Sequence, residues 1–290
     1  MMCGLVASGK STKAKELAEK YNATIFSSDA LREEMFGDVN DQTHNQELFV
    51  ELHKRIKDCL RSGKSAIYDA TNLNYKRRIA FLAELKNIPC EKICIVMATP
   101  LTVCYARNAM RERKVPCHVI ERMFKSFHVP YFYEGWNDIQ IEYGDYAKCF
   151  GKPMDFYIGY MNYDQHNSHH TLSLGEHCRQ VSLNVGYDED LLYAGLLHDC
   201  GKPACQTIVN KKGENDGNCH YYDHQYAGCY FSLFYDYGNV NPLDVAVLIM
   251  WHMQPYFNKE EKTKNKYRQL WGEELHKKLM RIHEADRHAH

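Results

Sequence analysis

The first half of the chain alternates between segments with helical periodicity and short apolar segments typical of β-strands. The expected helices cover residues 11–22, 46–64, 75–87 and 101–114, and the expected strands cover residues 23–28, 65–72 and 91–99. Alternation of this kind is typical of an α/β domain in which helices cover both faces of a parallel sheet.

After about residue 165 the strand pattern fades and apolar residues recur at helical spacing. The expected helices cover residues 175–185, 188–200, 224–238, 242–253 and 272–290. Ser173 and Glu176 have the spacing of a capping box that would begin the first of them. Residues 146–165 contain Gly, Pro and aromatic side chains without clear periodicity, which favours a short connector. We therefore expect an α/β domain at residues 1–150 and an all-α domain at residues 151–290.

Composition narrows the classes of protein that fit this pattern. Of 290 residues, 44% are hydrophobic and 25% are charged, which excludes wholesale disorder. The net charge of −1 excludes a strongly basic nucleic-acid-binding coat, although residues 1–150 are slightly positive and residues 151–290 slightly negative. No run approaches the roughly 20 apolar residues of a membrane helix, and no secretory signal is visible. We expect a cytoplasmic protein without a membrane partner, whose twelve scattered cysteines are reduced.

A glycine-rich motif stands near the start of the chain, where residues 4–11 read GLVASGKS and fit G-x-x-x-x-G-K-[ST]. Glycines let backbone N–H groups turn toward phosphate, the lysine reaches the β- and γ-phosphates, and the serine hydroxyl can coordinate Mg²⁺. We expect this P-loop to bind ATP and Mg²⁺ through Gly4, Ser8, Gly9, Lys10, Ser11 and Thr12. Only three residues precede the motif. Either they form a stub of the strand that normally leads into such a loop, or the N-terminus is truncated.

A carboxylate and an arginine follow the second expected strand, in the segment SSDALR at 27–32. At the carboxyl end of a parallel strand, the Asp29 side chain would point into a ligand cleft and could accept a proton from an attacking hydroxyl. Arg32, one helical turn further on, could hold a phosphate. Because aspartate is also a good N-cap, the alternative is that Asp29 only caps the helix LREEMF.

The order of these segments resembles polynucleotide-kinase-like P-loop kinases over roughly residues 3–145. The matching elements are S-x-D-x-x-R at 27–32, D-A-T-N at 69–72 followed by Arg77 and Arg78, and the basic segment 107–116, which resembles the kinase lid. The segment from Pro130 to Gly135 is also similar, without a physical role that the sequence reveals. The resemblance implies that Asp29 is the general base for a 5′-hydroxyl and that lid arginines neutralise the transferred phosphoryl group. It adds Arg111 as a catalytic residue and Asp69, Arg107 and Arg113 as nucleotide-binding residues.

Histidines are concentrated in the second half, where twelve of the sixteen lie. Histidine is the commonest metal ligand, which makes this half the place to look for a metal site. Chance alone predicts about one His-Asp dipeptide in this composition, so His198-Asp199 gains its meaning from context. It ends the apolar helical run 191–197, and Gly201 and Pro203 then break the helix. The further candidate ligands are His177 upstream and His220, His224, His252 and Asp286 downstream.

This order of residues resembles the HD phosphohydrolase superfamily. Over about residues 165–290, the segments AGLLHDCGKP, HYYDHQYAG, WHMQP and RIHEADR are similar to the HD domain of bacterial CCA-adding tRNA nucleotidyltransferases. The resemblance implies two metals bridged by the Asp199 carboxylate, and Lys202 as a ligand of substrate phosphate. One metal would be held by His177, His198, Asp199 and Asp286, and the other by His224 and His252, with His220 as a further candidate. These ligands suit Mn²⁺, Co²⁺, Ni²⁺, Fe²⁺ or Zn²⁺.

The remaining histidines are interpreted as packed or surface residues. These are His276, His283, His288 and His290. The pair His169-His170 stays unassigned between a place in the site and a surface loop.

Three functions fit the sequence. The first is a bifunctional enzyme that heals RNA ends, joining a 5′-hydroxyl kinase to a metal-dependent hydrolase of 2′,3′-cyclic phosphate or of 2′- or 3′-phosphate. Its partners would be RNA ends, with DNA ends as an alternative, and a downstream RNA ligase is a further candidate. The second is a small-molecule or nucleoside kinase fused to an HD nucleotidase, which the neutral charge favours. The third is a nucleotide-responsive regulatory module without catalysis.

Overall fold

The computed structural model describes residues 1–167 and 171–289 and divides into two compact units. Unit 1 comprises residues 1–120 and 130–144, and unit 2 comprises residues 121–129 and 145–290. The expected single boundary at residue 150 is therefore wrong in one respect, because residues 121–129 belong to the second unit. The reason is aromatic packing, since the rings of Phe124 and Phe127 lie 5.7 and 4.9 Å from the ring of Tyr230.

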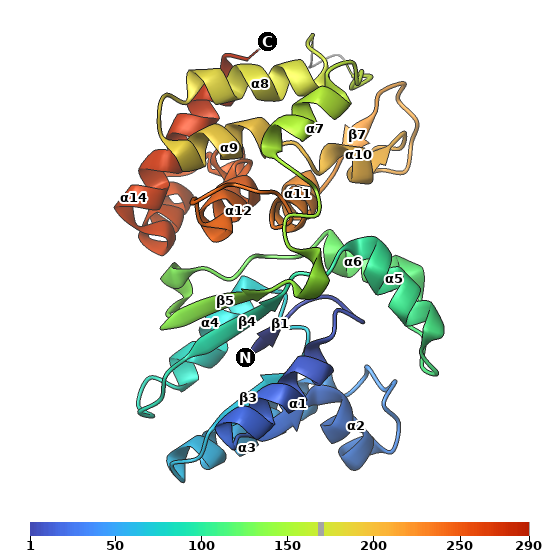
Figure 1. Ribbon diagram of the computed structural model, residues 1–290, viewed down its shortest axis with the longest axis vertical. Coiled ribbons are helices and arrows are strands. Elements are labelled where there is room, and N and C mark those ends of the chain that lie inside the picture. Colours follow the sequence, from blue (N-terminus) through green and yellow to red (C-terminus); the bar gives the residue numbers. More distant parts are fainter. Residues whose placement is uncertain (168–170, 290) are drawn as a thin grey trace. The chain divides into compact units, whose positions relative to one another are not determined.

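Unit 1 contains the parallel sheet that the sequence predicts (Figure 1). Its strands are β1 (Met2–Cys3), β2 (Thr24–Ser27), β3 (Ala66–Asp69), β4 (Ile93–Met97) and β5 (Asp138–Glu142). The strands pair in parallel as β1-β4-β5 and as β2-β3. The Gly4 N–H donates to Thr71 O at 3.0 Å, which places the end of β1 beside the end of β3. Met2 and Cys3 thus form the short strand that leads into the P-loop.

Unit 1 contains the helices α1 (Lys10–Tyr21), α2 (Ser28–Phe36), α3 (Asn45–Arg61), α4 (Tyr75–Glu84) and α5 (Leu101–Met110). Helix α6 (Cys117–Phe124) begins in unit 1, and its residues from 121 on belong to unit 2. Met2, Ala14, Ile67, Ile95 and Met97 form a core between α1 and the strands β1, β3 and β4. Burying these apolar side chains fixes the P-loop, because β1 and α1 lie at its two ends.

Helix α5 ends four residues earlier than the expected span 101–114. Arg111 has extended φ and ψ angles of −75° and 149°. The Asn108 side chain accepts from Val115 N and donates to Val115 O, which satisfies the backbone outside a helix. The following Pro116 also disfavours helical geometry at Val115. The basic lid segment is therefore a loop after Met110.

The described residues of unit 2 are helical, as expected, apart from one short hairpin (Figure 1). Its helices are α7 (Pro153–Tyr160), α8 (Leu174–Asn184), α9 (Glu189–Leu197), α10 (Lys202–Cys205), α11 (His224–Ser232), α12 (Pro242–Trp251), α13 (Gln254–Phe257) and α14 (Glu261–Arg287). Strands β6 (Gln206–Thr207) and β7 (His220–Tyr221) form the antiparallel hairpin. Among the described residues, no helix has the length and apolar character needed to cross a bilayer.

Local sequence signals explain where several of these helices begin and bend. Ser173 caps α8, since its hydroxyl accepts from Glu176 N at 3.3 Å, as the capping-box spacing predicts. Part of the expected connector is instead helix α7, which begins at Pro153. Helix α14 is broken at Gly272, whose φ of 76° and ψ of 168° are not helical.

Candidate phosphate-binding and metal sites

The P-loop lies between β1 and α1, with its glycines at positions where other residues do not fit. A Cβ on Gly4 would lie 2.8 Å from Ser8 Oγ and 2.9 Å from Met97 Cβ. Gly9 has a φ of 94°, which favours glycine, and it precedes the first turn of α1. The glycines therefore let the backbone turn tightly at the amino end of a helix, the place where anions bind favourably.

The expected phosphate ligands line this turn. The Lys10 ammonium donates to Leu5 O at 2.6 Å, inside the loop. Burial lowers the pKa of Lys10, and the nearby Asp69 carboxylate partly opposes that shift. Ser11 and Thr12 lie in the exposed first turn of α1, and Ser8 is buried within the loop. A nucleotide phosphate would stabilise the charge on Lys10, so the donor set fits the expected ligand.

Asp29 and Arg32 lie together at the beginning of α2, close to the carboxyl end of β2. Arg32 Nη1 donates to Asp29 Oδ1 at 3.1 Å, and Arg113 Nη1 donates to Asp29 Oδ2 at 2.9 Å. The helix is capped by Ser27, whose hydroxyl accepts from Ala30 N at 3.4 Å, so the alternative that Asp29 caps it is wrong. The Asp29 side chain is half exposed and does not cap the helix, which suits a group that receives a proton from a ligand.

Arg32 is almost fully buried, and its Nη2 donates to Asn45 Oδ1 at 3.0 Å. Within the part of the chain that the structure describes, its buried Nε–H has no hydrogen-bond partner. Because an unsatisfied buried donor is costly, this N–H is available to an oxygen of a ligand. The arrangement supports Arg32 as a phosphate-holding residue.

The lid arginines differ in how close they lie to these groups. Arg113 also bonds Asn40 Oδ1 and Val39 O, so it is held on the loop after α2. Arg107 lies near the P-loop, since its Nη1 is 3.6 Å from the position of a Cβ on Gly9. Arg111 is exposed at the end of α5, and among the described residues no hydrogen bond or ion pair joins it to the P-loop or to Asp29.

A buried ion pair supports the P-loop, and sequence reasoning missed its role. Glu134 accepts from Arg78 Nε at 2.7 Å, from Arg78 Nη2 at 2.6 Å and from Trp136 Nε1 at 3.0 Å. Arg78 Nη1 also donates to Asn72 O, and the Asn72 amide donates to Met2 O. The pair therefore ties the D-A-T-N loop to β1. The available signal was the similarity of the segment from Pro130 to Gly135 to polynucleotide-kinase-like kinases. The spacing of residues in the sequence did not show that Arg78 is the partner of Glu134.

Four histidines converge in unit 2 with the same orientation. Their Nδ1 atoms each lie 2.7–2.9 Å from a backbone carbonyl oxygen. The partners are Ala289 O for His177, Gly195 O for His198, Tyr221 O for His224 and Ile249 O for His252. A carbonyl accepts only from an N–H, so in the neutral form of each ring the lone pair is on Nε2. This second contact is the usual way in which a protein orients metal-binding histidines.

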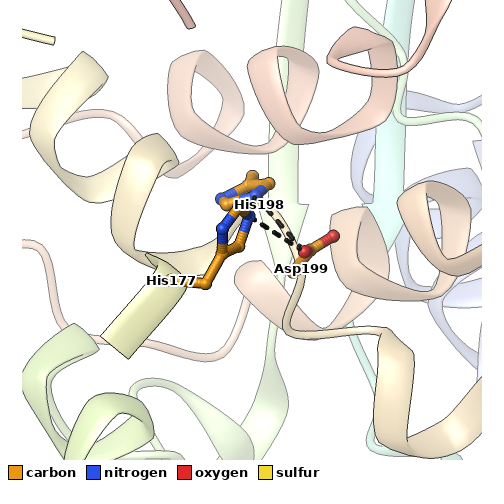
Figure 2. Close-up of side chains that lie close together, drawn as sticks. All are labelled: His177, His198 and Asp199. Carbon is orange, nitrogen blue, oxygen red and sulfur yellow. Dashed lines mark hydrogen bonds and ion pairs between the residues drawn. The ribbon is translucent and has the colours of Figure 1, made fainter. Parts of the chain in front are cut away.

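The Nε2 atoms gather around the Asp199 carboxylate in two groups, His177 with His198 and His224 with His252. Asp199 Oδ2 lies 3.6 and 3.4 Å from Nε2 of the first pair, and Oδ1 lies 3.1 and 3.8 Å from Nε2 of the second. Figure 2 shows the first group, with the His198 and His177 rings directed toward Asp199. Asp286 Oδ1 joins it at 3.1 Å from His177 Nε2. One carboxylate is thus shared between two nitrogen pairs, as expected for a bridging ligand.

The electrostatics of the cluster are those of a cation site. Burial lowers the pKa of His252 to about 3, and neighbouring His198 and His224 act in the same direction. Burial would raise the pKa of Asp199, but Lys202 and then His198 hold it well below its usual range. Burial would lower the pKa of His198, but the Asp199 carboxylate raises it well above the ordinary value. A buried carboxylate among four imidazole nitrogens is a set of ligands that fits a divalent transition metal. The residues present therefore fit the metals that the sequence predicts.

Lys202 lies against the shared carboxylate. Its Nζ is 2.7 Å from Asp199 Oδ2 and donates to Gln165 Oε1 at 2.7 Å. Gln165 is itself buried, and Tyr221 donates to its backbone carbonyl at 2.7 Å. Sequence reasoning missed Gln165, because it lies in an irregular segment without a motif.

The structure leaves other candidate residues outside the cluster. His220 Nε2 bonds Asp216 at 3.0 Å and belongs to neither group of ligands, so the suggestion that it joins the second metal is not supported. His276, His283 and His288 also lie outside both groups. The pair His169-His170 and His290 fall outside the described residues.

Comparisons with known families agree with this division. The family described as AAA domain matches residues 1–130, and the family described as HD domain matches residues 167–289. The chain joins a P-loop kinase-like domain to a helical HD domain. The two matches support an enzyme with a kinase-type part and a phosphohydrolase-type part.

One curated relative matches about half of the chain. It is the L-seryl-tRNA(Sec) kinase of Methanococcus maripaludis, 26% identical over 149 residues, which are 49% of this chain and 58% of that protein. The chain thus spans less than two thirds of that relative's length. A solved structure of a candidate kinase from Chloroflexus aurantiacus is 19% identical and covers 49% of this chain and 81% of its own. Its TM-score of 0.40 is too low to support an argument about this fold.

Proposed function

We propose that this protein heals RNA ends with two separate sites. The kinase-like domain transfers the γ-phosphoryl group of ATP to a 5′-hydroxyl, and the HD domain hydrolyses a 2′,3′-cyclic phosphate or a terminal 2′- or 3′-phosphate. The observation that carries this proposal is the Asp29 carboxylate, whose charge acts on Lys10 of the P-loop, in the same chain as a carboxylate shared by two histidine pairs. Many RNA breaks leave a 5′-hydroxyl and a cyclic phosphate, and sealing requires both ends to be converted.

In the kinase-like domain each residue has a distinct task. Asp29 accepts the proton of the attacking hydroxyl, and Arg32 keeps the carboxylate in place through their hydrogen bond. Lys10 and the P-loop N–H groups bind the phosphates of ATP, with Mg²⁺ held by Ser11. The arginines of the lid neutralise the phosphoryl group during transfer. The name of the relative from M. maripaludis, a kinase of a tRNA-linked group, supports an RNA acceptor.

In the HD domain two metal ions would be held by the histidine pairs, Asp199 and Asp286. Bound metal supplies a water of lowered pKa and polarises a phosphoryl oxygen. The protein orients the four imidazoles through backbone carbonyls, and Lys202 adds a positive charge beside Asp199 for a substrate phosphate. The similarity to the HD domain of CCA-adding enzymes supports a substrate at an RNA 3′ end.

An RNA oligonucleotide with a 5′-hydroxyl and a 2′,3′-cyclic phosphate tests the proposal directly. With ATP, Mg²⁺ and Mn²⁺ present, we expect the 5′ end to gain a phosphate and the cyclic phosphate to open, each measured separately by mass spectrometry. If ATP is consumed only with nucleosides and neither end changes, the protein is a small-molecule kinase and the proposal is wrong. If ATP is not consumed and neither RNA end changes, the proposal is wrong and the protein is better described as a regulatory module without catalysis.

A further inference from the structure

A basic segment stands out in the otherwise acidic second half of the chain. Residues 259–268 contain five basic and two acidic side chains, whereas residues 151–290 as a whole contain 14 basic and 18 acidic ones. The segment leads into and forms the first turns of α14. Five of the 14 basic side chains in residues 151–290 therefore lie in one stretch of ten residues.

This stretch follows a residue that contacts the cluster of histidines around Asp199 and Asp286. The Tyr256 hydroxyl of α13 donates to Asp286 Oδ2 at 2.9 Å, and its ring lies 4.3 Å from the ring of His283. Lys262 follows Tyr256 by six residues, so the two α-carbons are at most about 20 Å apart. Lys262 is therefore close enough to the cluster for one short RNA strand of a few nucleotides to reach both.

The side chains of this stretch are turned to solvent. Phe257 is 60% exposed, and Lys259, Lys262 and Lys266 are exposed as well. Among the described residues no carboxylate forms an ion pair with these three lysines, unlike Lys264, which pairs with Glu261 at 3.6 Å. Lys262 and Lys266 are four residues apart and lie on one helix face. Their charges are therefore available to an anionic partner.

Exposed lysines within nine residues of an exposed aromatic ring match the chemistry of a single-stranded nucleic acid. Phosphates pair with the ammonium groups, and a base stacks on the ring. We propose that Phe257, Lys259, Lys262 and Lys266 form a strand-binding surface that holds the RNA segment leading to the HD centre. The inference deepens the proposed function and rests on it. It assigns the HD site a polynucleotide 3′ end rather than a free nucleotide as its substrate.

The variant Lys262→Ala/Lys266→Ala tests this surface, because alanine keeps the helix and removes two charges. For an RNA decamer that ends in a 2′,3′-cyclic phosphate we expect KM to rise roughly tenfold. For a 2′,3′-cyclic mononucleotide we expect unchanged kcat and KM. In fluorescence anisotropy with a labelled single-stranded RNA, the slope of log Kd against log salt should become shallower by about 1.4, the share of two phosphate contacts.

The matched control is Lys211→Ala/Lys212→Ala, which removes two exposed charges between β6 and β7. It should leave decamer KM and the salt slope as in the wild type. The inference is overturned if the test variant binds and hydrolyses the decamer normally, if it loses mononucleotide turnover equally, or if the control loses as much. The inference is also overturned if the test variant loses binding to phosphatidylserine vesicles but binds RNA normally, because the lysines would then bind a lipid surface instead of RNA. If the wild type hydrolyses neither substrate, the proposed function fails, and the anisotropy comparison still decides whether the surface binds RNA.

Discussion

At the scale of single residues, the HD cluster depends on contacts of two kinds. Asp199 presents one oxygen to each histidine pair, and its place directly after His198 made it readable from the sequence. The orientation of the imidazoles was not readable, because it comes from backbone carbonyls such as Ala289 O, 112 residues away from His177. Residue identity therefore predicts the ligands, whereas their geometry follows only from the folded backbone.

Asp29→Ala should abolish phosphorylation of the 5′-hydroxyl and leave hydrolysis of the cyclic phosphate intact. The reason is that the variant removes the proton acceptor without touching unit 2, where the other ligands lie. A kinase assay and a phosphoesterase assay on one preparation measure both. His198→Ala is the reciprocal control and should lose only the hydrolysis. If each variant loses both activities while circular dichroism shows a preserved fold, the two sites are not separable.

His53 should make the stability of unit 1 depend on pH. Burial lowers its pKa, an effect that Glu84 only partly opposes. Below about pH 6.5 the unfolded chain binds a proton that the folded state takes up less readily, so the free energy of unfolding falls as the pH falls through that range. Urea unfolding at pH 7.5 and 5.5 measures the loss. His53→Gln should show a smaller loss, and an identical pH dependence in both proteins would contradict this role.

At the scale of elements, local signals predicted most of the helices and strands of unit 1 but missed strand β5. The expected helix 11–22 and strand 23–28 correspond to α1 and β2, where periodicity and capping are local properties. Strand β5 was not predicted, although Ile139 and Ile141 alternate with polar residues as in a half-buried strand. The role of Glu134 could not be predicted, since its partner Arg78 lies 56 residues earlier.

Glu134→Gln should destabilise unit 1 by about 3–5 kcal/mol. The change keeps the side-chain volume but leaves the buried Arg78 guanidinium without its counter-charge. Chemical unfolding followed by a probe in unit 1 gives the free energy. Glu142→Gln is the control, since its ion pair with Lys13 is about one third exposed and should cost less than about 1 kcal/mol. Equal losses in the free energy of unfolding for the two variants would contradict the prediction, because the buried Arg78–Glu134 pair would then stabilise unit 1 no more than the partly exposed Lys13–Glu142 pair.

At the scale of the whole molecule, two units with different folds hold the two candidate sites. The order of P-loop, S-x-D-x-x-R, D-A-T-N and H…HD…D motifs predicted this division, because each motif belongs to one fold. The exchange of residues 121–129 into unit 2 could not be predicted, since it depends on the packing of Phe127 on Tyr230. A ligand for one site should therefore stabilise its own unit.

Mn²⁺ should raise the unfolding temperature of unit 2 and leave that of unit 1 unchanged. At 100 times its Kd a ligand stabilises the folded state by about 2.7 kcal/mol, or roughly 5–10 °C for a unit of this size. Differential scanning calorimetry with Mn²⁺ and with EDTA measures the shift. Asp199→Ala should abolish it, because both ligand groups lose their shared carboxylate. His276→Ala, a histidine outside both groups, should keep the full shift. An equal shift in the Asp199 variant would mean that Mn²⁺ binds elsewhere.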